Sequence, residues 1–298
     1  MLSILIPTYN YNISDLVREI HEQATKSKIK FEIICFDDNS REFTHENKST
    51  IDSLSYSKII VSKKNLGRTE SRQKLAKESI YNWLLFLDAD VLPKSNNFII
   101  NYINNKINTK YEAIFGGFSY TKIYPNNGVI LRWKYGKTFE DVNAKERNIK
   151  PYRVIISANF LIQKNIFTKI NSEIKIKSYG LDNYFASLLK QYNVNVLHIN
   201  NEVYHFGLER NEVYLNKIEE SLRTLLEITN NHNVFEHDNK LLSVFQFFKR
   251  YKFNHLFAYI YPLLNSSIKK NLLGENPNLV LLQFYKILYI CYIDSKNI

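Results

Sequence analysis

The stretch Trp83-Leu84-Leu85-Phe86-Leu87-Asp88-Ala89-Asp90 predicts a buried strand that runs directly into two acidic side chains. A run of apolar residues of this length is typical of a parallel strand that is buried on both faces. Ligands of open α/β sheets bind beyond the carboxyl ends of the strands, where Asp88 and Asp90 are expected. Two carboxylates there suit Mg²⁺ or Mn²⁺ shared with a substrate phosphate. For this tripeptide alone, a solvated turn that only closes the strand stays an open alternative.

The first ninety residues alternate between strands and helices. Apolar runs predict strands over 3–6, 31–36, 58–61 and 83–87. Periodic apolar positions predict helices over 13–20 and 69–80. Alternation at this spacing indicates an α/β fold with a mostly parallel sheet that is flanked by helices.

Each of these predicted strands ends in polar or charged side chains. The strand-end residues are Thr8-Tyr9-Asn10, Asp37-Asp38, Asn65 with Arg68, and Asp88 with Asp90. In a parallel sheet the carboxyl ends of the strands lie along one edge. A polar loop explains any single case, but the recurrence of acids and an arginine favours one site along that edge.

The chain beyond Pro93 has shorter elements. Strands are predicted over 113–115, 157–162 and 194–199, and a helix is predicted from Asp182. The segment 125–150 is polar with mixed charges, which predicts a long loop beside the site.

From Asn211 onward, periodic apolar positions such as Val213, Leu222 and Leu225 predict helices. Breaks in this helical region are predicted at Pro262, Gly274 and Pro277. We therefore predict a catalytic domain over 1–208 and an α-helical C-terminal region over 209–298.

The composition indicates a basic protein without a membrane span. The chain of 298 residues has a net charge of +11, which suggests an anionic partner such as a nucleotide, phospholipid or nucleic acid. The cations are scattered, and genome base composition also produces such a bias. Cys35 and Cys291 lack metal-binding or redox spacing, and Cys35 is expected to be a reduced core thiol. Because no leader sequence and no apolar run of about 18 residues is visible, we expect a cytoplasmic protein.

The motifs together resemble glycosyltransferase family two, of bacterial type, whose members have the GT-A fold. The matching segments are Ile4-Leu5-Ile6-Pro7-Thr8-Tyr9-Asn10, Asp37-Asp38-Asn39-Ser40, Asn65-Leu66-Gly67-Arg68 with Arg72, and Asp88-Ala89-Asp90. Each segment is short and common, but their order and spacing are specific. The resemblance extends from Ser3 to about residue 208. It implies a GT-A, Rossmann-like sheet and a nucleotide-sugar donor, for which we expect a UDP-sugar.

The resemblance implies a nucleotide site along the strand ends. Its nucleotide-binding residues are Pro7, Thr8, Tyr9, Asn10, Asp38, Asn65, Arg68 and Asp88. Tyr9 either stacks on the base or simply packs in its loop, and Asp38 accepts a hydrogen bond from the base. Arg68 opens a helix whose N-terminal amides favour anions such as the diphosphate. A divalent cation, Mn²⁺ or Mg²⁺, is implied at Asp90, with Asp88 toward the ribose or the metal's waters.

The remaining roles also follow from the resemblance. Gly180-Leu181-Asp182-Asn183 is similar to the Gly-(Glu)-Asp pattern of the family, which makes Asp182 the general base of an inverting displacement. Leu181 stands where the family usually has an acid, and Asp182 equally fits a helix N-cap. His205 is either a further metal ligand or a structural histidine. Asn159 is assigned to the acceptor side.

Three other functions fit parts of the same pattern. Asp88-Ala89-Asp90-Val91-Leu92 resembles the nucleophile motif of haloacid dehalogenase-type phosphatases, but that motif usually lies on the first strand of the core. A nucleotidyltransferase normally has a glycine or lysine in the loop after its first strand, and Pro7-Thr8-Tyr9-Asn10 has neither. A nucleic-acid binder needs a basic stripe, which the strand-end acids argue against.

The basic, aromatic segment from Phe245 to Tyr261 predicts either helix packing or contact with an anionic membrane. Membrane contact suits a lipid-linked acceptor. We therefore expect a metal-dependent hexosyltransferase that acts on a saccharide or lipid-linked acceptor in cell-surface polysaccharide or glycolipid synthesis. Its expected location is the cytoplasm, with peripheral contact at the inner face of the membrane as an option and no nucleic-acid partner.

Overall fold

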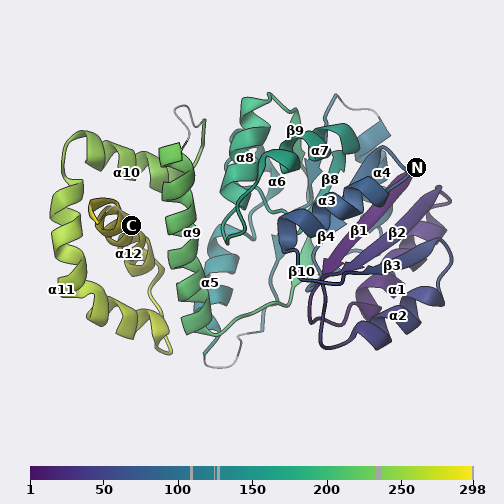
Figure 1. Cartoon of the computed structure of the whole chain (residues 1–298), viewed down its shortest axis with the longest axis horizontal. Coiled ribbons are helices and arrows are strands. Elements are labelled where there is room, and N and C mark those ends of the chain that lie inside the picture. The colour runs from purple at the N-terminus through teal and green to yellow at the C-terminus, as the bar shows by residue number, and fades with distance from the viewer. Residues whose placement is uncertain (108–109, 124, 126–127, 232–235, 297–298) are drawn as a thin grey trace. The chain divides into compact units, whose positions relative to one another are not determined.

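The computed structural model describes residues 1–107, 110–123, 125, 128–231 and 236–296 (Figure 1). The chain forms two compact units. The first unit comprises Met1–Tyr120, Glu140–Lys177 and Tyr192–Gly207, and the second comprises Thr121–Phe139, Ser178–Gln191 and Leu208–Ile298. The sequence suggested a single boundary near residue 208, whereas the chain contributes two earlier segments to the second unit.

A seven-stranded sheet lies at the centre of the first unit (Figure 1). Its strands are β1 (Leu2–Thr8), β2 (Phe31–Asp37), β3 (Ser57–Val61), β4 (Trp83–Leu87), β6 (Ala113–Phe115), β8 (Asn159–Gln163) and β9 (Val196–His198). Their order is β3-β2-β1-β4-β8-β6-β9. Strands β3, β2, β1 and β4 are parallel, β8 is antiparallel to both neighbours, and β6 and β9 are parallel. The predicted mostly parallel α/β sheet is confirmed.

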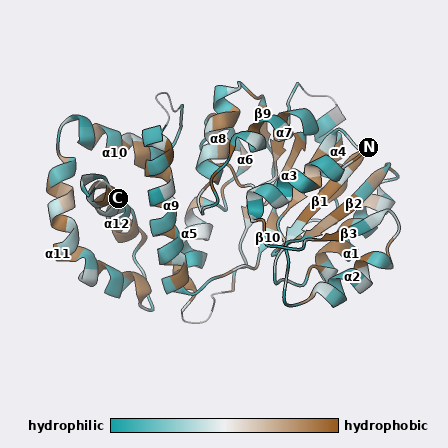
Figure 2. Ribbon diagram, in the orientation of Figure 1, coloured by the Kyte–Doolittle hydropathy of each residue, from teal (hydrophilic) through white to brown (hydrophobic). Residues whose placement is uncertain are grey.

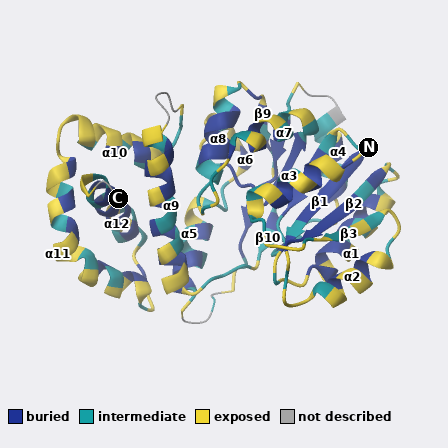
Figure 3. Cartoon of the chain, viewed as in Figure 1, coloured by how far each residue is buried: buried dark blue, intermediate teal, exposed yellow. Residues whose placement is uncertain are grey.

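Helices flank this sheet because its central strands are apolar on both faces. The helices of the unit are α1 (Ser14–Lys26), α2 (Thr44–Asp52), α3 (Arg68–Glu78), α4 (Phe98–Ile107), α6 (Ala144–Ile149) and α7 (Lys164–Glu173). Helix α1 packs against α2 and α4, and α3 packs against α7. Figure 2 shows the hydrophobic colouring of β1, β2 and β4, and Figure 3 shows that the same strands are buried.

Aromatic rings join the parallel half of the sheet to the antiparallel strand. The Phe160 ring of β8 stacks on Phe86 of β4 and on Phe115 of β6, with ring centroids 5.1 and 5.3 Å apart. All three side chains are fully buried. Strand β4, with its run of apolar residues, therefore lies in the middle of the core.

The segment 125–150, predicted as a polar loop, contains helices instead. These are α5 (Ile130–Phe139) and α6, while residues 126–127 lie outside the described residues. Ile130 and Leu131 are buried, and Asn143 caps α6 by accepting a hydrogen bond from the Lys145 amide at 2.9 Å. The prediction was wrong because the many charges of the segment hid its few apolar positions.

A second sheet consists of three short strands of the first unit. These are β5 (Val91–Pro93), β7 (Phe118–Ser119) and β10 (Val203–His205), in the order β5-β10-β7. Strand β10 is antiparallel to β5, and its last residue, His205, is opposite Val91. This pairing brings the chain after residue 203 back to the loop that follows β4.

The second unit is helical. Besides α5 it contains α8 (Asp182–Gln191), α9 (Asn211–Asn231), α10 (Lys240–Arg250), α11 (Asn254–Leu273) and α12 (Leu279–Ser295). Leu222 and Leu225 are buried as predicted, whereas Val213 is exposed. None of the helices in the described part of the chain is long and apolar enough to span a bilayer.

Pro262 does not break the helical region where the sequence predicted a break. It lies inside α11, whereas Gly274 follows the last residue of that helix as expected. Ala258 and Tyr261 of α11 are buried in the core that α11 shares with α12. This packing outweighs the one backbone hydrogen bond that a proline removes from a helix.

A buried histidine and arginine connect β9 to α6 in the first unit. Arg147 Nη1 donates to His198 Nδ1 at 2.9 Å, and because arginine has no acceptor, His198 Nε2 carries the proton and donates to the Pro151 carbonyl at 2.7 Å. Burial, together with the charge of Arg147, lowers the pKa of His198 from 6.5 to about 4. His198 is therefore neutral at physiological pH.

We expect the free energy of unfolding to fall as the pH decreases from 6.5 to about 4, the two pKa values of His198 in the unfolded and folded chain. Within that window the unfolded chain binds a proton that the folded protein excludes. The contribution of neutral His198 to the free energy of unfolding is therefore fully present above the window and absent below it. Relative to His198→Gln, the parent should lose on the order of 3 kcal/mol across the window. Urea unfolding at several pH values measures the difference, and parallel pH profiles of the two proteins would contradict the assignment.

Candidate active site

The carboxyl ends of β1, β2 and β4 form one edge of the sheet, as expected for parallel strands. The Asp38 amide, just after β2, donates to the Thr8 carbonyl at the end of β1 at 2.9 Å. Asp88 follows β4, and Arg68 begins α3. Hydrogen bonds of Asp38 and Asp88 bring these strand ends and the start of α3 together.

Asp38 organises the loop that precedes α3. Its Oδ1 accepts a hydrogen bond from the Leu66 amide at 2.7 Å, and its Oδ2 accepts one from the Gly67 amide at 2.8 Å. Asn65 Nδ2 donates to the Asp38 carbonyl at 3.2 Å. Gly67 has φ +86°, and its Cβ position would lie 2.8 Å from Lys177 Cε, so this turn requires glycine. The Asp38 carboxylate is buried and fixes the N-terminus of α3.

Asp88 is held between two guanidinium groups. Arg68 Nη2 lies 2.5 Å from Asp88 Oδ2, and Arg72 Nη2 lies 2.6 Å from Asp88 Oδ1. The two arginines differ in environment, because the side chain of Arg68 is 45% exposed and that of Arg72 only 8%. Arg68 therefore retains a surface that a ligand can reach, whereas Arg72 supports Asp88 from inside the protein.

Arg72 is positioned by several contacts in the core. Its guanidinium lies over the rings of Phe86 and Phe160, 5.9 and 5.8 Å from their centroids. It also donates to the Ser157 carbonyl. Cation–π contacts and charge-assisted hydrogen bonds together offset the cost of burying the charge. The sequence included Arg72 only as part of a motif, because its apolar surroundings come from strands that are far away along the chain.

Asp90 faces His205 across the small sheet. His205 Nε2 lies 3.3 Å from Asp90 Oδ2, and the Phe206 amide donates to the Asp90 carbonyl at 2.9 Å. The His205 ring packs on Phe118, with centroids 4.8 Å apart. Burial alone raises the pKa of Asp90, but the hydrogen bond and charge of His205 and the charge of Arg68 outweigh it and lower the pKa. Asp90 is therefore ionised at neutral pH.

Gly207 closes this corner of the site and was not singled out from the sequence. A Cβ at this position would collide with Asp90 Oδ2 and would lie 3.1 Å from His205 Nε2. The glycine therefore permits the backbone to pass directly beside the Asp90 carboxylate. The sequence feature that could have indicated this role is the position of Gly207 two residues after His205, the last residue of β10.

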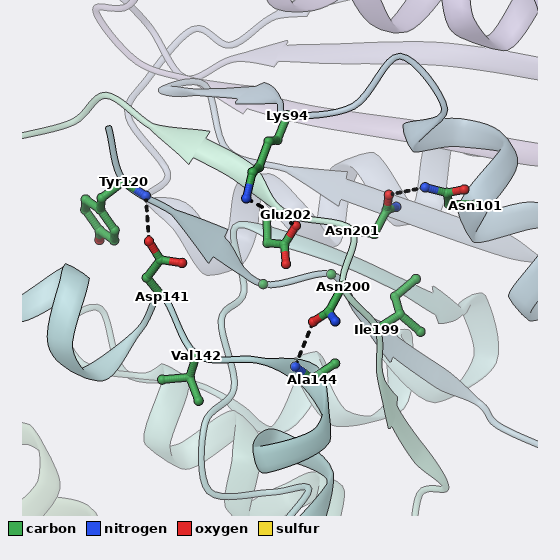
Figure 4. A network of polar contacts seen from close by, with 12 residues as sticks. Lys94, Asn101, Tyr120, Asp141, Val142, Ala144, Ile199, Asn200, Asn201 and Glu202 are labelled. Atoms are coloured by element: carbon green, nitrogen blue, oxygen red, sulfur yellow. Dashed lines mark hydrogen bonds and ion pairs between the residues drawn. The ribbon is translucent and has the colours of Figure 1, made fainter. Parts of the chain in front are cut away.

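The turn that leads into β10 is anchored at several points (Figure 4). Asn200 Oδ1 accepts from the Ala144 amide at 2.8 Å, and Asn201 Oδ1 accepts from Asn101 Nδ2 at 3.0 Å. Glu202 lies 3.9 Å from Lys94 in a weaker, partly exposed ion pair. These contacts fix the start of β10 and thereby the position of His205 at its end.

Asp90 and His205 are the side chains that fit a divalent cation best. Among the described residues, no three His, Cys, Asp or Glu side chains gather into a metal cluster. Both oxygens of Asp88 contact arginines, so the structure does not present Asp88 as a direct ligand. His205 Nδ1 is buried without a hydrogen-bond partner in the described part of the chain. One carboxylate and one imidazole leave most coordination positions of a bound metal ion to water and substrate oxygens. Such a ligand set suits Mn²⁺ or Mg²⁺.

The loop after β1 presents two exposed aromatic residues, Tyr9 and Tyr11. Pro7 and Thr8 belong to β1, and the side chain of Thr8 donates to the Tyr11 carbonyl at 3.2 Å. Asn10 has φ +50° and holds its loop through the Arg41 amide, which donates to Asn10 Oδ1 at 2.8 Å. Tyr9 is 51% exposed and Tyr11 36% exposed. Tyr9 is the more exposed of the two and therefore offers the larger surface for a base.

Asn159 does not support the acceptor-side assignment. Its side chain is fully buried: Oδ1 accepts from the Tyr102 hydroxyl at 2.6 Å, and Nδ2 donates to the carbonyls of Gly117 and Asn201 at 3.0 and 2.9 Å. All of these partners are in the first unit. Asn159 therefore ties β8 to the segments before β7 and β10, and an acceptor would find no exposed part of it.

Asp182 is the first residue of α8 in the second unit. The preceding turn contains Gly180, which has φ +87° and whose Cβ position would lie 2.5 Å from Ser221 Cβ of α9. The Tyr179 amide donates to Glu220 Oε1 at 2.9 Å. Close packing on α9 therefore fixes the turn that begins α8 and carries Asp182.

Proteins with this architecture bind nucleotides at the strand ends, and the class that combines it with an Asp-x-Asp loop after β4 has the GT-A fold. Comparison with known proteins makes the assignment specific. Residues 3–170, more than half of the chain, match the family model of glycosyl transferase family 2. The chain belongs to this family. The predicted GT-A fold and glycosyltransferase class are confirmed.

A curated relative supports the same family. It is described as an uncharacterized glycosyltransferase of Haemophilus influenzae (strain ATCC 51907 / DSM 11121 / KW20 / Rd) and is 33% identical over 134 residues. The match covers 40% of this chain and 42% of the relative. The chain thus matches less than half the length of this curated relative.

Solved structures share the fold at low sequence identity. Mannosyltransferase PcManGT from Pyrobaculum calidifontis, in complex with GDP-Man and Mn²⁺, has a TM-score of 0.59 and 10% identity, covering 99% of this chain and 86% of that one. Glucosyl-3-phosphoglycerate synthase from Mycobacterium tuberculosis, in complex with Mn²⁺, UDP and glucosyl-3-phosphoglycerate, has a TM-score of 0.50 and 12% identity, covering 76% and 79%. At these identities the likeness concerns the fold.

The two arginines at Asp88 should differ in their effect on stability. Arg72→Gln leaves a largely buried carboxylate without its interior partner and should lower the free energy of unfolding by about 3 kcal/mol. Arg68→Gln removes a half-exposed partner and should lower it by less than about 1 kcal/mol. Denaturant unfolding of both variants measures the difference. Equal losses would contradict the distinct roles of the two arginines.

Proposed function

We propose that this chain is a metal-dependent, inverting glycosyltransferase that transfers a sugar from a UDP-sugar to a hydroxyl acceptor. The proposal rests on two neighbouring sets of contacts after β4: two arginines hold Asp88, and His205 faces Asp90. It places cations and metal-binding oxygens together at the edge where α/β sheets bind nucleotides. Such a combination stabilises the negative charge of a diphosphate leaving group.

Asp90 and His205 would hold the divalent cation in this proposal. The low pKa of Asp90 keeps its carboxylate charged at neutral pH. When bound, Mn²⁺ or Mg²⁺ supplies Lewis-acid stabilisation of the negative charge on the departing diphosphate. Asp88, held by its arginines, is better suited to accept a hydrogen bond from the ribose than to bind the metal directly.

Arg68 and the start of α3 would bind the diphosphate. Helix α3 begins at Arg68 without a side-chain cap on its N-terminus, so its first amides favour an anion. The half-exposed guanidinium of Arg68 adds a positive charge beside them. These groups stabilise the leaving phosphate more strongly as its charge develops.

Asp38 and Tyr9 would recognise the base. Each carboxylate oxygen of Asp38 already accepts one backbone hydrogen bond, which leaves one lone pair on each oxygen for a donor of the base. The proposed base is uracil, whose single N–H would donate to one of these oxygens. The Tyr9 ring would stack on the face of the base.

Asp182 would act as the general base. In an inverting displacement the acceptor oxygen bonds to the anomeric carbon as the bond to the diphosphate breaks, and the acceptor proton moves to a carboxylate. Asp182 is proposed for this role because of its place in the family pattern at the start of α8. The acceptor is proposed to be a saccharide or a lipid-linked saccharide of the cell surface. Membership of family 2 removes the support for a phosphatase, a nucleotidyltransferase or a nucleic-acid binder.

A panel of nucleotide sugars tests this function. We expect release of UDP from one or more UDP-sugars with Mn²⁺ or Mg²⁺, little release from GDP-mannose, and none with a chelator. Asp182→Asn should lower kcat/KM by about 10²-fold or more, because proton transfer contributes that much. The control Asp52→Asn alters an exposed residue of α2 whose ion pair with Lys48 is on the surface. Turnover in chelator, or full activity of Asp182→Asn, would contradict the proposal.

A further inference from the structure

Helices α10 and α11 carry exposed apolar side chains that do not take part in the core of their unit. Six large side chains of this segment are at least half exposed: Phe247 (53%), Tyr251 (56%), Phe253 (50%), Leu256 (55%), Tyr259 (72%) and Leu263 (66%). We refer to these six side chains as the α10–α11 surface. Isolated exposed apolar residues are ordinary, but a cluster on neighbouring turns marks an interaction site.

Most residues of this surface fall into two groups, one on α11 and one at the end of α10. Leu256, Tyr259 and Leu263 have the i, i+3, i+7 spacing of one helix face. The rings of Phe247 and Tyr251 lie 4.8 Å apart at the end of α10. Figure 3 shows exposed positions along α11, and Figure 2 shows hydrophobic residues among them.

The other face of α11 already packs in the core of its unit. Ala258, Tyr261 and Ile268 are buried in the cluster that α11 shares with α12. A helix at the surface of a water-soluble unit normally has a polar outer face. Helix α11 is therefore apolar on both faces, and the outer one lacks a partner in the described part of the unit.

Positive charge surrounds the α10–α11 surface. The segment 240–274 contains no Asp or Glu, and its cations are Lys240, Lys249, Arg250, Lys252, Lys269 and Lys270. The acids that reach this segment are neutralised, since Lys249 pairs with Asp294 at 2.6 Å and Lys269 with Glu219 at 2.8 Å. Arg250 and Lys252 are exposed and alternate with Tyr251 and Phe253 along the chain, and Lys270 is exposed in the last turn of α11. The surface therefore has a net positive charge.

We propose that the α10–α11 surface binds an anionic phospholipid bilayer and lies in its headgroup region. Exposed Phe, Tyr and Leu bordered by Lys and Arg are the features of an interfacial helix, because apolar side chains enter the acyl boundary while cations contact lipid phosphates. A second copy of the chain fits less well, since a symmetric contact would bring the same cations together. This binding does not depend on the sugar-transfer activity.

Vesicle sedimentation of the full chain tests the surface directly. We expect the protein to sediment with phosphatidylcholine vesicles that contain phosphatidylglycerol, to stay in solution with phosphatidylcholine alone, and to be released by high salt. Tyr259→Ser/Leu263→Ser should weaken binding by about ten-fold or more. Arg250→Gln/Lys252→Gln should weaken it by roughly 30-fold, at about five-fold for each charge. A blue shift of Tyr259→Trp fluorescence on adding anionic vesicles would report insertion.

Matched controls separate this surface from general hydrophobicity and charge. Ile80→Ser/Ile149→Ser changes two side chains of the first unit that are 70% and 76% exposed. Lys28→Gln/Lys30→Gln removes two exposed cations of that unit. Both controls should bind vesicles as the parent does, and circular dichroism should show all variants folded. Equal binding to neutral vesicles, equal losses in the controls, or lipid-independent self-association abolished by Tyr259→Ser/Leu263→Ser would overturn the proposal.

Discussion

The ion pair between Arg72 and Asp88 is the interaction on which the rest of the site depends. It joins the buried face of α3 to the end of β4 through a 2.6 Å contact. Removing one partner of a largely buried ion pair costs several times more than breaking a surface pair. Because Asp88 is two residues before Asp90, fixing it also fixes the start of the loop that carries the second carboxylate.

The small sheet supplies the other half of the constraint. Pairing of β10 with β5 places His205 opposite Val91, so the histidine returns to the loop after β4 although it is more than a hundred residues away along the chain. Gly207 leaves room beside the Asp90 carboxylate for this close approach. Buried asparagine side chains, including Asn159, hold the segment before β10 in place. The arrangement of Asp90 and His205 is thus built by backbone pairing and small or fully hydrogen-bonded residues.

The parallel half of the sheet could be predicted because each strand is a continuous apolar run and each end is polar. The helices α5 and α6 could not be predicted, because the mixed charges of their segment obscured its few apolar positions. Strands β5, β7 and β10 could not be predicted because they are too short to show a periodicity. The helix break predicted at Pro262 was wrong because a rule based on the local sequence does not include the packing of α11 on α12. The acceptor-side assignment of Asn159 finds no support because three neighbouring segments bury its side chain, and contacts of this kind are not visible in a local sequence pattern. The contacts of Arg72 with Phe160 and of Gly207 with Asp90 join distant parts of the chain, which no local pattern reveals.

We propose that the exposed Arg68, the ionised Asp90 and the neutral donors at the start of α3 together bind a nucleoside diphosphate through a metal. Calorimetric titration of UDP into the parent protein and into Asp90→Asn, each with Mn²⁺ and with chelator, tests this proposal most directly. We expect Mn²⁺ to tighten UDP binding to the parent by about ten-fold or more and Asp90→Asn to lose this gain. Equal affinity of the parent for UDP with Mn²⁺ and with chelator, or an undiminished gain in Asp90→Asn, would contradict it.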